Sequence, residues 1–161
     1  MSTTVELIRD LDTARDAFGE AVDAVDLELA TAPGIVGAWS VRDLVVHLAF
    51  WCEHGTEALR LATAGRASEF AYDTADTDRM NAELEHEARR TSPSAASERE
   101  ERAFGALREA IATLEPGMLG LRLGNGDTVE QVIRYDGPDH YAEHTDHIRA
   151  WFADEGDDDQ E

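Results

Sequence analysis

The sequence contains no lysine, and all 14 of its basic residues are arginine. A chain without lysine has no lysine Schiff base and no lysine general base, so both kinds of catalysis are excluded. Cysteine is almost as scarce. The single cysteine, Cys52, has no partner for an internal disulfide, which is typical of proteins from a reducing compartment.

Long apolar runs are also missing. The first residues, MSTTVELIRDLDTARDAF, alternate apolar and charged side chains, so they predict no signal peptide. No stretch approaches the roughly 20 apolar residues that span a bilayer. These absences predict a soluble, cytoplasmic protein with no membrane partner.

Basic charge is scarce relative to acidic charge, and the 35 acidic residues give a formal net charge of −21. A surface of this sign repels phosphate backbones and anionic lipids. The composition therefore predicts that the protein has no nucleic-acid partner. Part of the acidic charge lies in residues 155–161, which we expect to form a disordered, solubilising tail.

Apolar residues are plentiful, at 42% of the chain, which is enough for a folded core. The length fits one domain, which we place at residues 1–154. The helical period of the apolar residues predicts long helices near 4–31, 40–64, 94–115 and 139–154, and a short one near 77–90. These elements predict an all-α four-helix bundle with one additional short helix.

Local signals place two of the helix starts and leave one segment open. Ser40 with Asp43, and Ser97 with Glu100, predict capping boxes at the second helix and at the helix near 94–115. The segment TVEQVIRY, which follows the turn LGNGD, reads equally as a hairpin strand or a short helix.

Three of the six histidines lie within the stretch HYAEHTDHIRAWF, residues 140–152. A helix advances about 100° per residue, so His140 and His144 lie one turn apart, a spacing that lets two imidazoles reach one ion. Ile148 and Trp151 continue this face, which predicts that it is buried. His47 has an equivalent position on the apolar face of the second helix.

A single histidine on an apolar face is more often a core residue bonded to a carbonyl or a carboxylate than a metal ligand. Three histidines on two core faces favour a metal site, because an unsatisfied buried imidazole costs about 1–3 kcal/mol. His147 shares the face of His140 and His144. Three roles are open to it: a fourth metal ligand, a hydrogen-bond donor to one of the ligand rings, or an ordinary polar neighbour, and the last two are favoured.

The remaining candidates are weaker. His54 lies about 10.5 Å from His47 along the helix axis, too far for the same ion. His86 is in a solvated helix and is expected to be exposed. Cys52 is expected to pack in the core rather than to bind metal.

The segments GAWSVRDLVVHLAFW and HYAEHTDHIRAWF resemble the DinB-like superfamily of metal-binding four-helix bundles. This group includes relatives of mycothiol-dependent maleylpyruvate isomerase, bacillithiol transferases and the colibactin self-resistance family. The resemblance covers residues 5–152. Its most specific parts are the Trp39-Ser40 helix start, with His47 seven residues after Ser40, and the late His-x3-His helix.

The resemblance implies an up-down-down-up bundle, often a homodimer, with a divalent metal ion at one end of a cleft. The family's three ligands fall on His47, His140 and His144, and its members bind ions such as zinc or nickel. His147 falls where many members carry a polar residue that is not a ligand. We find no distinct second domain like the one some thiol-dependent isomerases add, so the resemblance does not extend to that reaction.

Three histidines leave coordination positions open, which suits catalysis better than a closed structural site. The first hypothesis is a metal-dependent thiol transferase that joins a low-molecular-weight thiol cosubstrate to a small-molecule electrophile. The second is a metal-dependent hydrolase or resistance protein acting on a reactive small molecule, and the third is a non-catalytic metal-binding or ligand-binding protein. Tyr141, Glu143 and Asp146 are polar neighbours that fit a supporting role, a general base or an ordinary surface position.

Overall fold

The structure is a computed structural model that describes the backbone of residues 2–157 and the side chains of residues 2–153. Within this range the chain forms α1 (Thr4–Asp23), α2 (Val41–Thr63), α3 (Thr74–Ala88), α4 (Pro93–Thr113), α5 (Val129–Asp136) and α6 (Pro138–Asp157). Short 3₁₀ turns, η1 (Leu27–Leu29), η2 (Ala67–Glu69) and η3 (Pro116–Gly120), lie in the connections. The described part of the chain has no strand beyond two isolated bridges, so the predicted all-α class is confirmed.

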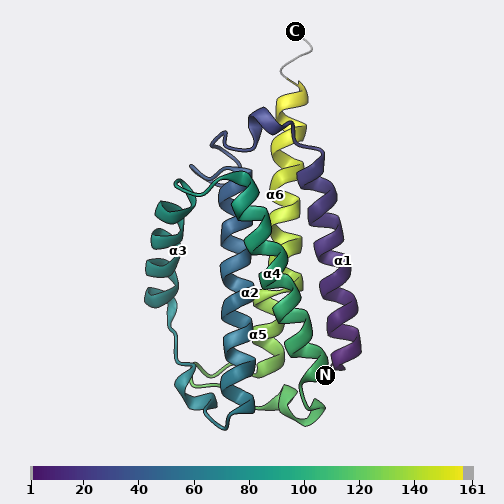
Figure 1. The fold of residues 1–161 in the computed structure, drawn as a ribbon, viewed down its shortest axis with the longest axis vertical. Helices are drawn as coiled ribbons and strands as arrows, with labels where there is room; N and C mark the ends of the chain where they lie inside the picture. Colours follow the sequence, from purple (N-terminus) through teal and green to yellow (C-terminus); the bar gives the residue numbers. More distant parts are fainter. Residues whose placement is uncertain (1, 158–161) are drawn as a thin grey trace.

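The four long helices α1, α2, α4 and α6 form the bundle (Figure 1). α1 runs away from the N-terminal end of the molecule, α2 and α4 both run back, and α6 again runs in the direction of α1. This is the predicted up-down-down-up topology. α3 provides the crossover that lets α2 and α4 point the same way, and it lies to one side of the bundle. α5 leads directly into α6, so two additional helices accompany the bundle, where one was predicted.

Polar caps fix the starts of these helices. At four starts, a capping side chain accepts a bond from the amide three residues on, and the residue there bonds back to the cap. The caps are Thr3, Ser40, Asp73 and Thr128. Each such cap stabilises its helix by about 1 kcal/mol, because free amides of the first turn gain partners. The predicted box of Ser40 and Asp43 is confirmed.

One predicted boundary and one predicted cap are wrong. A helix over 4–31 would be about 42 Å long and would outrun its partners, which have 23 and 20 residues. The chain instead leaves α1 at Asp23 and crosses the end of the bundle. α4 begins at Pro93 with Ser92 as its cap, not with Ser97. Glu100 does not serve the predicted box, because it is buried and bonds to Arg15 of α1.

The core runs through the bundle and includes the apolar faces of α1, α2, α4, α5 and α6. Its largest fully buried side chains are Tyr141, Phe70, Leu7, Leu11, Leu44, Leu48, Leu59, Leu107, Ile111, Ile133, Ile148 and Val46. Cys52 is fully buried among them, as predicted. None of the helices within residues 2–157 combines the length and apolarity needed to cross a bilayer.

The connection between α4 and α5 packs closely on the loop that follows α2. The amide of Gly124 donates to the carbonyl of Ala67 at 3.0 Å, and the amide of Asn125 donates to the carbonyl of Phe70 at 2.9 Å. A Cβ at position 124 would lie 2.1 Å from the carbonyl oxygen of Ser68, so the close approach of the two backbones requires glycine there.

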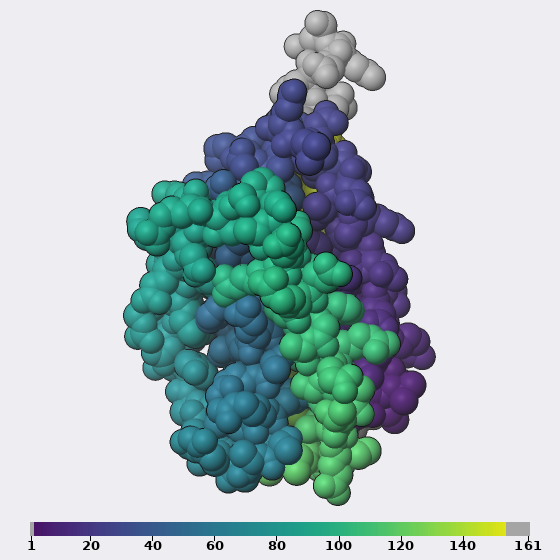
Figure 2. All heavy atoms as spheres, viewed as in Figure 1, coloured from purple at the N-terminus to yellow at the C-terminus, as the bar shows by residue number. Residues whose placement is uncertain are grey.

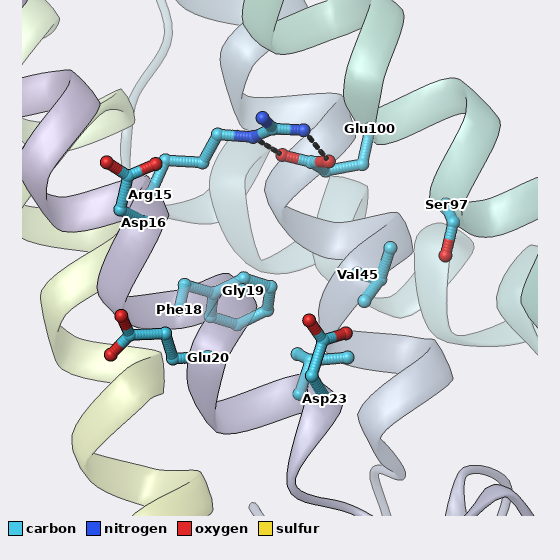
Figure 3. Close-up of a pocket in the computed structure, with 10 residues that line it drawn as sticks. Arg15, Asp16, Phe18, Gly19, Glu20, Asp23, Val45, Ser97 and Glu100 are labelled. Atoms are coloured by element: carbon cyan, nitrogen blue, oxygen red, sulfur yellow. Dashed lines mark hydrogen bonds and ion pairs between the residues drawn. The ribbon is translucent and has the colours of Figure 1, made fainter.

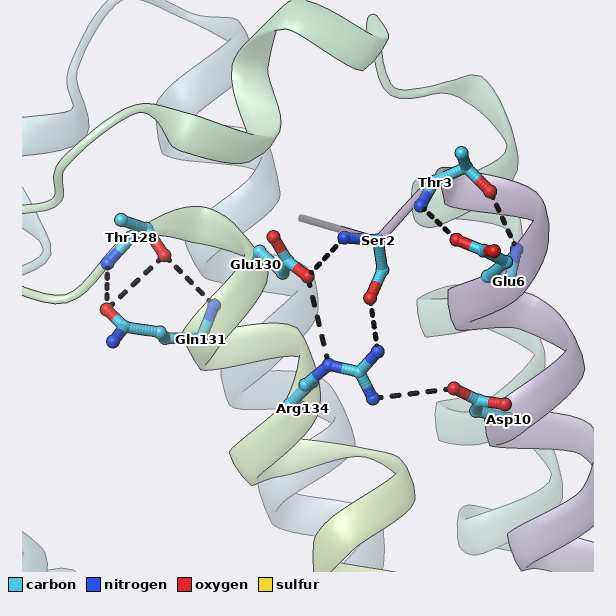
Figure 4. A network of polar contacts seen from close by, with 8 residues as sticks. All are labelled: Ser2, Thr3, Glu6, Asp10, Thr128, Glu130, Gln131 and Arg134. Atoms are coloured by element: carbon cyan, nitrogen blue, oxygen red, sulfur yellow. Dashed lines mark hydrogen bonds and ion pairs between the residues drawn. The ribbon is translucent and has the colours of Figure 1, made fainter.

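A polar network ties the first residues to α5 (Figure 4). The amide of Ser2 donates to the carboxylate of Glu130 at 2.8 Å, and Arg134 contacts both Glu130 and Asp10 of α1. α5 is therefore fixed against α1. Because only Gly137 separates α5 from α6, the same network sets where α6 begins.

α3 is attached to the bundle by a small set of contacts. Its buried residues are Leu84 and Ala88. Asn81 accepts a hydrogen bond from Trp51 Nε1 at 3.1 Å, and Glu87 pairs with Arg99 of α4 at 3.1 Å. Figure 2 shows that α3 and α2 do not close against each other along their whole length. This separation leaves room for a cleft between the crossover and the bundle.

The predicted tail, residues 155–161, begins inside α6, which extends to Asp157. Residues 158–161 lie outside the described part of the chain.

Candidate metal centre

The structure brings together the three histidines that the sequence singled out. His47 projects from α2, and His140 and His144 project from successive turns of α6. One ring nitrogen of each lies within 4.8 Å of the other two. The Nε2 atoms of His47 and His140 are 2.8 Å apart. Residues separated by about a hundred positions in the sequence thus form one cluster.

Helix starts and aromatic packing set the positions of these rings. The capping box at Ser40 fixes the register of α2 two turns before His47. The ring of Trp39 packs edge-on against His47, with centroids 4.6 Å apart, and Trp51 contacts the same ring from the following turn, at 6.2 Å. Pro138 is the first residue of α6, one residue before the predicted start, and places His140 in the first turn of that helix.

Burial keeps all three imidazoles neutral. His47 and His144 are 6% and 5% exposed. Burial, followed by the neighbouring imidazoles, lowers the pKa of His47 to about 2 and that of His144 to about 3. Burial also lowers the pKa of His140 to about 4. Neutral imidazole is the form that binds metal ions, so the cluster is ready for a ligand role at neutral pH.

His147 orients one of the three rings. Its Nδ1 lies 3.1 Å from the Nδ1 of His144, and this contact leaves the Nε2 of His144 buried without any hydrogen-bond partner. The Nδ1 of His47 is also buried and unpartnered. Since an unsatisfied buried polar atom costs about 1–3 kcal/mol, the cluster is incomplete as a hydrogen-bonded structure.

The donor set fits a divalent cation of the zinc or nickel type. Imidazole nitrogens bind such ions at about 2.0–2.1 Å, which places neighbouring ligand nitrogens about 3.3 Å apart in a tetrahedral site. The Nε2 atoms of His47 and His140 lie 2.8 Å apart, and all three donor nitrogens lie within 4.8 Å of one another, so small shifts would reach that value. An ion would also provide a partner for the Nε2 of His144. Metal binding itself stays a prediction.

A cleft of about 310 Å³ opens on this cluster between α2, α3, α5 and α6. Its histidines are His47 and His140, and its remaining lining residues are Trp51, Thr77, Asn81, Tyr135, Asp136, Asp139 and Glu143. Thr77 and Asn81 come from α3, which therefore forms one wall of the cleft. The volume suits a small molecule.

A second polar pair lies in the same region and was not predicted. Asp136, the last residue of α5, accepts a hydrogen bond from His54 Nδ1 at 2.9 Å. Asp136 also lines the cleft. Asp136 lies four residues before His140 in the sequence, and this short separation is a signal that could have found it.

The other candidate residues lie outside the three-histidine cluster, at positions that differ in burial and surroundings. His86 is exposed, as predicted, and His54 is outside the three-histidine cluster, as expected from its spacing. Of the polar neighbours, Glu143 lines the cleft, whereas Asp146 lines a separate groove between α1 and α6. Tyr141 is fully buried and belongs to the core, not to the surface or the cleft.

Tyr141 is part of a buried polar network that joins three helices. Its hydroxyl donates to Glu100 of α4 at 2.6 Å, and Arg15 of α1 donates two bonds to the same carboxylate, each 2.9 Å long. Figure 3 shows the ion pair of Arg15 and Glu100 beside a cavity of about 460 Å³, which Asp16 and Asp23 also line. The network is separate from the histidine cluster and holds α1, α4 and α6 together.

Residues 11–155 match the family model described as the mycothiol maleylpyruvate isomerase N-terminal domain. No curated protein matches the sequence significantly.

Two solved structures are similar to this fold. An uncharacterised protein from Escherichia coli UTI89 superposes with a TM-score of 0.83 and 16% sequence identity, covering 97% of this chain and 96% of its own. The colibactin self-resistance protein ClbS, in complex with a dsDNA, superposes with a TM-score of 0.78 and 17% identity, covering 93% of this chain and 95% of its own. At these identities the similarity shows the fold.

The prediction that excluded a nucleic-acid partner is wrong as a deduction from charge. ClbS, a protein of this fold, is crystallised in complex with a dsDNA. The net charge of −21 is a sum over the whole chain, whereas nucleic acid contacts only a local surface, where a few arginines and backbone amides supply the phosphate contacts. The total charge therefore does not decide whether this fold binds DNA.

Proposed function

The chain belongs to the mycothiol maleylpyruvate isomerase N-terminal domain family, within the DinB-like superfamily, and from this membership we propose that it is a metal-dependent thiol transferase acting on small electrophiles. The observation that carries the proposal is the convergence of His47, His140 and His144 beside a cleft. Three neutral donors leave positions open beside the cleft, as a catalytic site requires.

The residues of the chain have separate roles in this proposal. His47, His140 and His144 would hold a divalent ion, zinc or nickel, and His147 would keep the ring of His144 in place. When bound, the ion supplies Lewis acidity, which lowers the pKa of a thiol or a water beside it. Trp51 and the α3 residues Thr77 and Asn81 wall the cleft and limit the water around the substrate.

The thiol must come from outside the chain. Cys52, the one cysteine, is fully buried, and burial raises its pKa to about 12. A thiol of that pKa is almost entirely protonated at neutral pH, and no electrophile can reach it. A low-molecular-weight thiol entering the 310 Å³ cleft is the nucleophile that the proposal requires.

The test is turnover of a generic electrophile by the metal-loaded protein with mycothiol, bacillithiol, glutathione or no thiol. We expect a rate that depends on one thiol, is lost in His144→Ala, and is kept in His86→Ala, which changes an exposed histidine. A thiol-independent rate would instead identify a hydrolase. No rate under any of these conditions would identify a binding protein.

The similarity to ClbS supports a second candidate, a resistance protein that hydrolyses a reactive small molecule. The same histidine cluster would serve it, with water in place of the thiol. Duplex DNA enters as a partner to test, by fluorescence anisotropy of a labelled duplex at low and at moderate salt. Because phosphate contacts release counterions, binding should weaken steeply as salt rises. Unchanged anisotropy at low salt would restrict the partners to small molecules.

Two further expectations belong to the same proposal. The chain is expected to form a homodimer, as the family resemblance implies, and to be cytoplasmic, as its composition indicates. Sedimentation velocity at high protein concentration tests the first expectation, and a monomer there would contradict it. Cell fractionation tests the second.

A further inference from the structure

Asp136 presents one carboxylate oxygen to a histidine and the other to the cleft. Oδ2 accepts from His54 Nδ1 at 2.9 Å. Oδ1 has no hydrogen-bond partner among the described residues, and it is not fully buried. Because Asp136 lines the cleft, we take Oδ1 as the oxygen that solvent reaches from that side.

Among the described residues, the ring of His54 has one hydrogen-bond partner, Asp136. Its ring lies among the rings of Trp51, Phe70 and Tyr72, with centroids 4.7 to 4.8 Å away. The Nε2 atom is buried among them with no partner. A proton on Nε2 would have no acceptor, so the ring carries its proton on Nδ1 and donates it to Asp136.

α2 makes room for this carboxylate. A Cβ at Gly55, one residue after His54, would lie 3.2 Å from the Cβ of Asp136 and 3.5 Å from its Oδ2. Glycine at position 55 therefore lets the end of α5 approach the helix that carries His54. His140 follows Asp136 by four residues, across the Gly137 junction between α5 and α6, and both line the same cleft.

From this arrangement we propose that Asp136 is the proton acceptor for the nucleophile in the cleft, with His54 as the residue that positions it. The proposal rests on the proposed thiol-transfer function, and it adds a catalytic group to the site. Asp136 precedes the proposed ligand His140 by four residues. In the described residues, no hydrogen bond joins Asp136 to any of the three proposed ligands.

The proton balance of the step is complete. As the sulfur of the thiol forms its bond to the electrophilic carbon, the proton of the S–H passes to Oδ1 of Asp136. If the electrophile has a leaving group, the carbon–leaving-group bond breaks with its electron pair, and Asp136 returns the proton to that group. If the electrophile is an activated alkene, the π pair moves to the adjacent carbon, which takes the proton. Asp136 ends each cycle ionised again.

The charges around Asp136 suit this role. The groups near it are His54 from α2, Tyr135 from α5, Asp139, His140 and Glu143 from α6, and Asp127 from the preceding loop, while α3 contributes only the neutral Thr77 and Asn81 to the cleft. Among the residues whose side chains the structure describes, no arginine lines the cleft. Burial raises the pKa of Asp136, and the hydrogen bond from His54 acts in the opposite direction. A carboxylate with no arginine partner and a raised pKa takes up a proton more readily than an exposed one.

The test compares Asp136→Asn with Asp78→Asn, which removes an exposed carboxylate of α3 outside the cleft. We expect Asp136→Asn to keep the metal content and the circular dichroism of the wild type and to lose about 10²–10⁴-fold in rate, the usual contribution of general acid–base catalysis. The acid limb of its pH–rate profile should disappear. Asp78→Asn should retain the rate and the limb.

His54→Phe is the second variant, because the aromatic surroundings accept another ring while the donor is removed. Loss of the hydrogen bond raises the pKa of Asp136, so the acid limb should move to higher pH with the metal content unchanged. A readout independent of activity is the ¹⁵N spectrum of the His54 ring, which should show a protonated Nδ1 in the wild type and a changed signal in Asp136→Asn.

The outcomes separate this inference from the function on which it rests. If the wild type turns over and Asp136→Asn keeps both its rate and its acid limb, the assignment of Asp136 is overturned while the transferase function stands. If His54→Phe leaves the limb in place, the positioning role of His54 is overturned. If the metal-loaded wild type shows no thiol-dependent rate, the proposed function fails, and the role of Asp136 fails with it.

Discussion

His144 and His54 each have a partner for Nδ1 and none for Nε2, but different groups surround the two rings. In His144, the Nδ1 faces His147 and the Nε2 is buried without a partner. In His54, the Nδ1 bonds to Asp136, and the Nε2 is likewise buried without a partner, here among aromatic side chains. Both residues share a residue type and a largely buried position. Only His144 has neighbouring imidazoles that complete a donor set.

The first prediction concerns metal content. His47→Ala, His140→Ala and His144→Ala should each abolish stoichiometric binding of zinc or nickel, because two remaining imidazoles leave too few donors. His147→Ala should weaken binding by about 10–100-fold, the usual effect of removing a group that orients a ligand. His86→Ala is the matched control. Elemental analysis after dialysis measures these effects, and full metal content in His47→Ala would confine the site to α6.

The second prediction concerns acid stability of the metal-free protein. The pKa values of His47, His140 and His144 are about 2, 4 and 3 in the folded chain and 6.5 when unperturbed. As pH falls from about 6.5 towards 4, the unfolded chain binds protons that the folded chain refuses, so stability is lost over that window. Three protons correspond to about 5 kcal/mol between pH 7 and pH 5.

Urea titrations at these pH values measure the loss. His144→Gln removes one of the three groups, so the pH slope should fall by about a third. His86→Gln, which changes an exposed histidine, should leave the slope unchanged. A metal-free protein that gains stability as pH falls through this window would contradict the assignment of neutral imidazoles.

At the scale of helices, the sequence predicted the site better than it predicted the surroundings of the site. His47, His140 and His144 lie on long helices with clear apolar faces, so periodicity alone placed them in the core. Asp136 lies in an eight-residue helix whose pattern also fits a strand. Its bond to His54 joins residues 82 positions apart, which no local pattern contains. The predicted end of α1 was wrong for a similar reason. The length of the neighbouring helices limits α1, and a local sequence pattern does not contain that length.

The third prediction concerns the clasp between helices formed by Arg15, Glu100 and Tyr141. Glu100→Ala would leave the guanidinium and the hydroxyl without their shared acceptor near the core. Removing one partner of a buried ion pair typically costs about 3–5 kcal/mol. Arg15 is partly exposed, so we expect about 3 kcal/mol. Chemical denaturation measures the loss, and Glu101→Ala, at the adjacent exposed position, should change stability by less than about 0.5 kcal/mol.

At the scale of the whole molecule, acidic residues outnumber basic residues, and the formal net charge is −21. Several arginines pair with acids three or four residues away on their own helix, including Arg60 with Glu57 and Arg89 with Glu85. With 35 acidic and 14 basic residues, such pairing still leaves an excess of 21 negative charges. Mutual repulsion among these acids opposes folding at neutral pH.

The fourth prediction follows from this excess. Raising sodium chloride from 10 to 300 mM shortens the screening length from about 30 Å to below 8 Å, which weakens the long-range repulsion more than it weakens contact ion pairs. We expect the Tm of the metal-free protein to rise by several degrees. Thermal denaturation followed by circular dichroism measures the change, and a fall in Tm would mean that the paired charges outweigh the repulsion.

Under the proposed function, the crossover α3 would contribute to substrate selection, while other helices carry the proposed reactive groups. The topology requires a segment that returns from the end of α2 to the start of α4, and here that segment walls the cleft with Thr77 and Asn81. It contributes only Leu84 and Ala88 to the buried interior. The histidines and Asp136 come from other helices. Under the proposed function, exchanging the 15 residues of α3 while keeping Leu84 and Ala88 should change which molecules enter the cleft and leave the histidine cluster in place. α3 is therefore the segment to graft when the specificity of this bundle is to be changed.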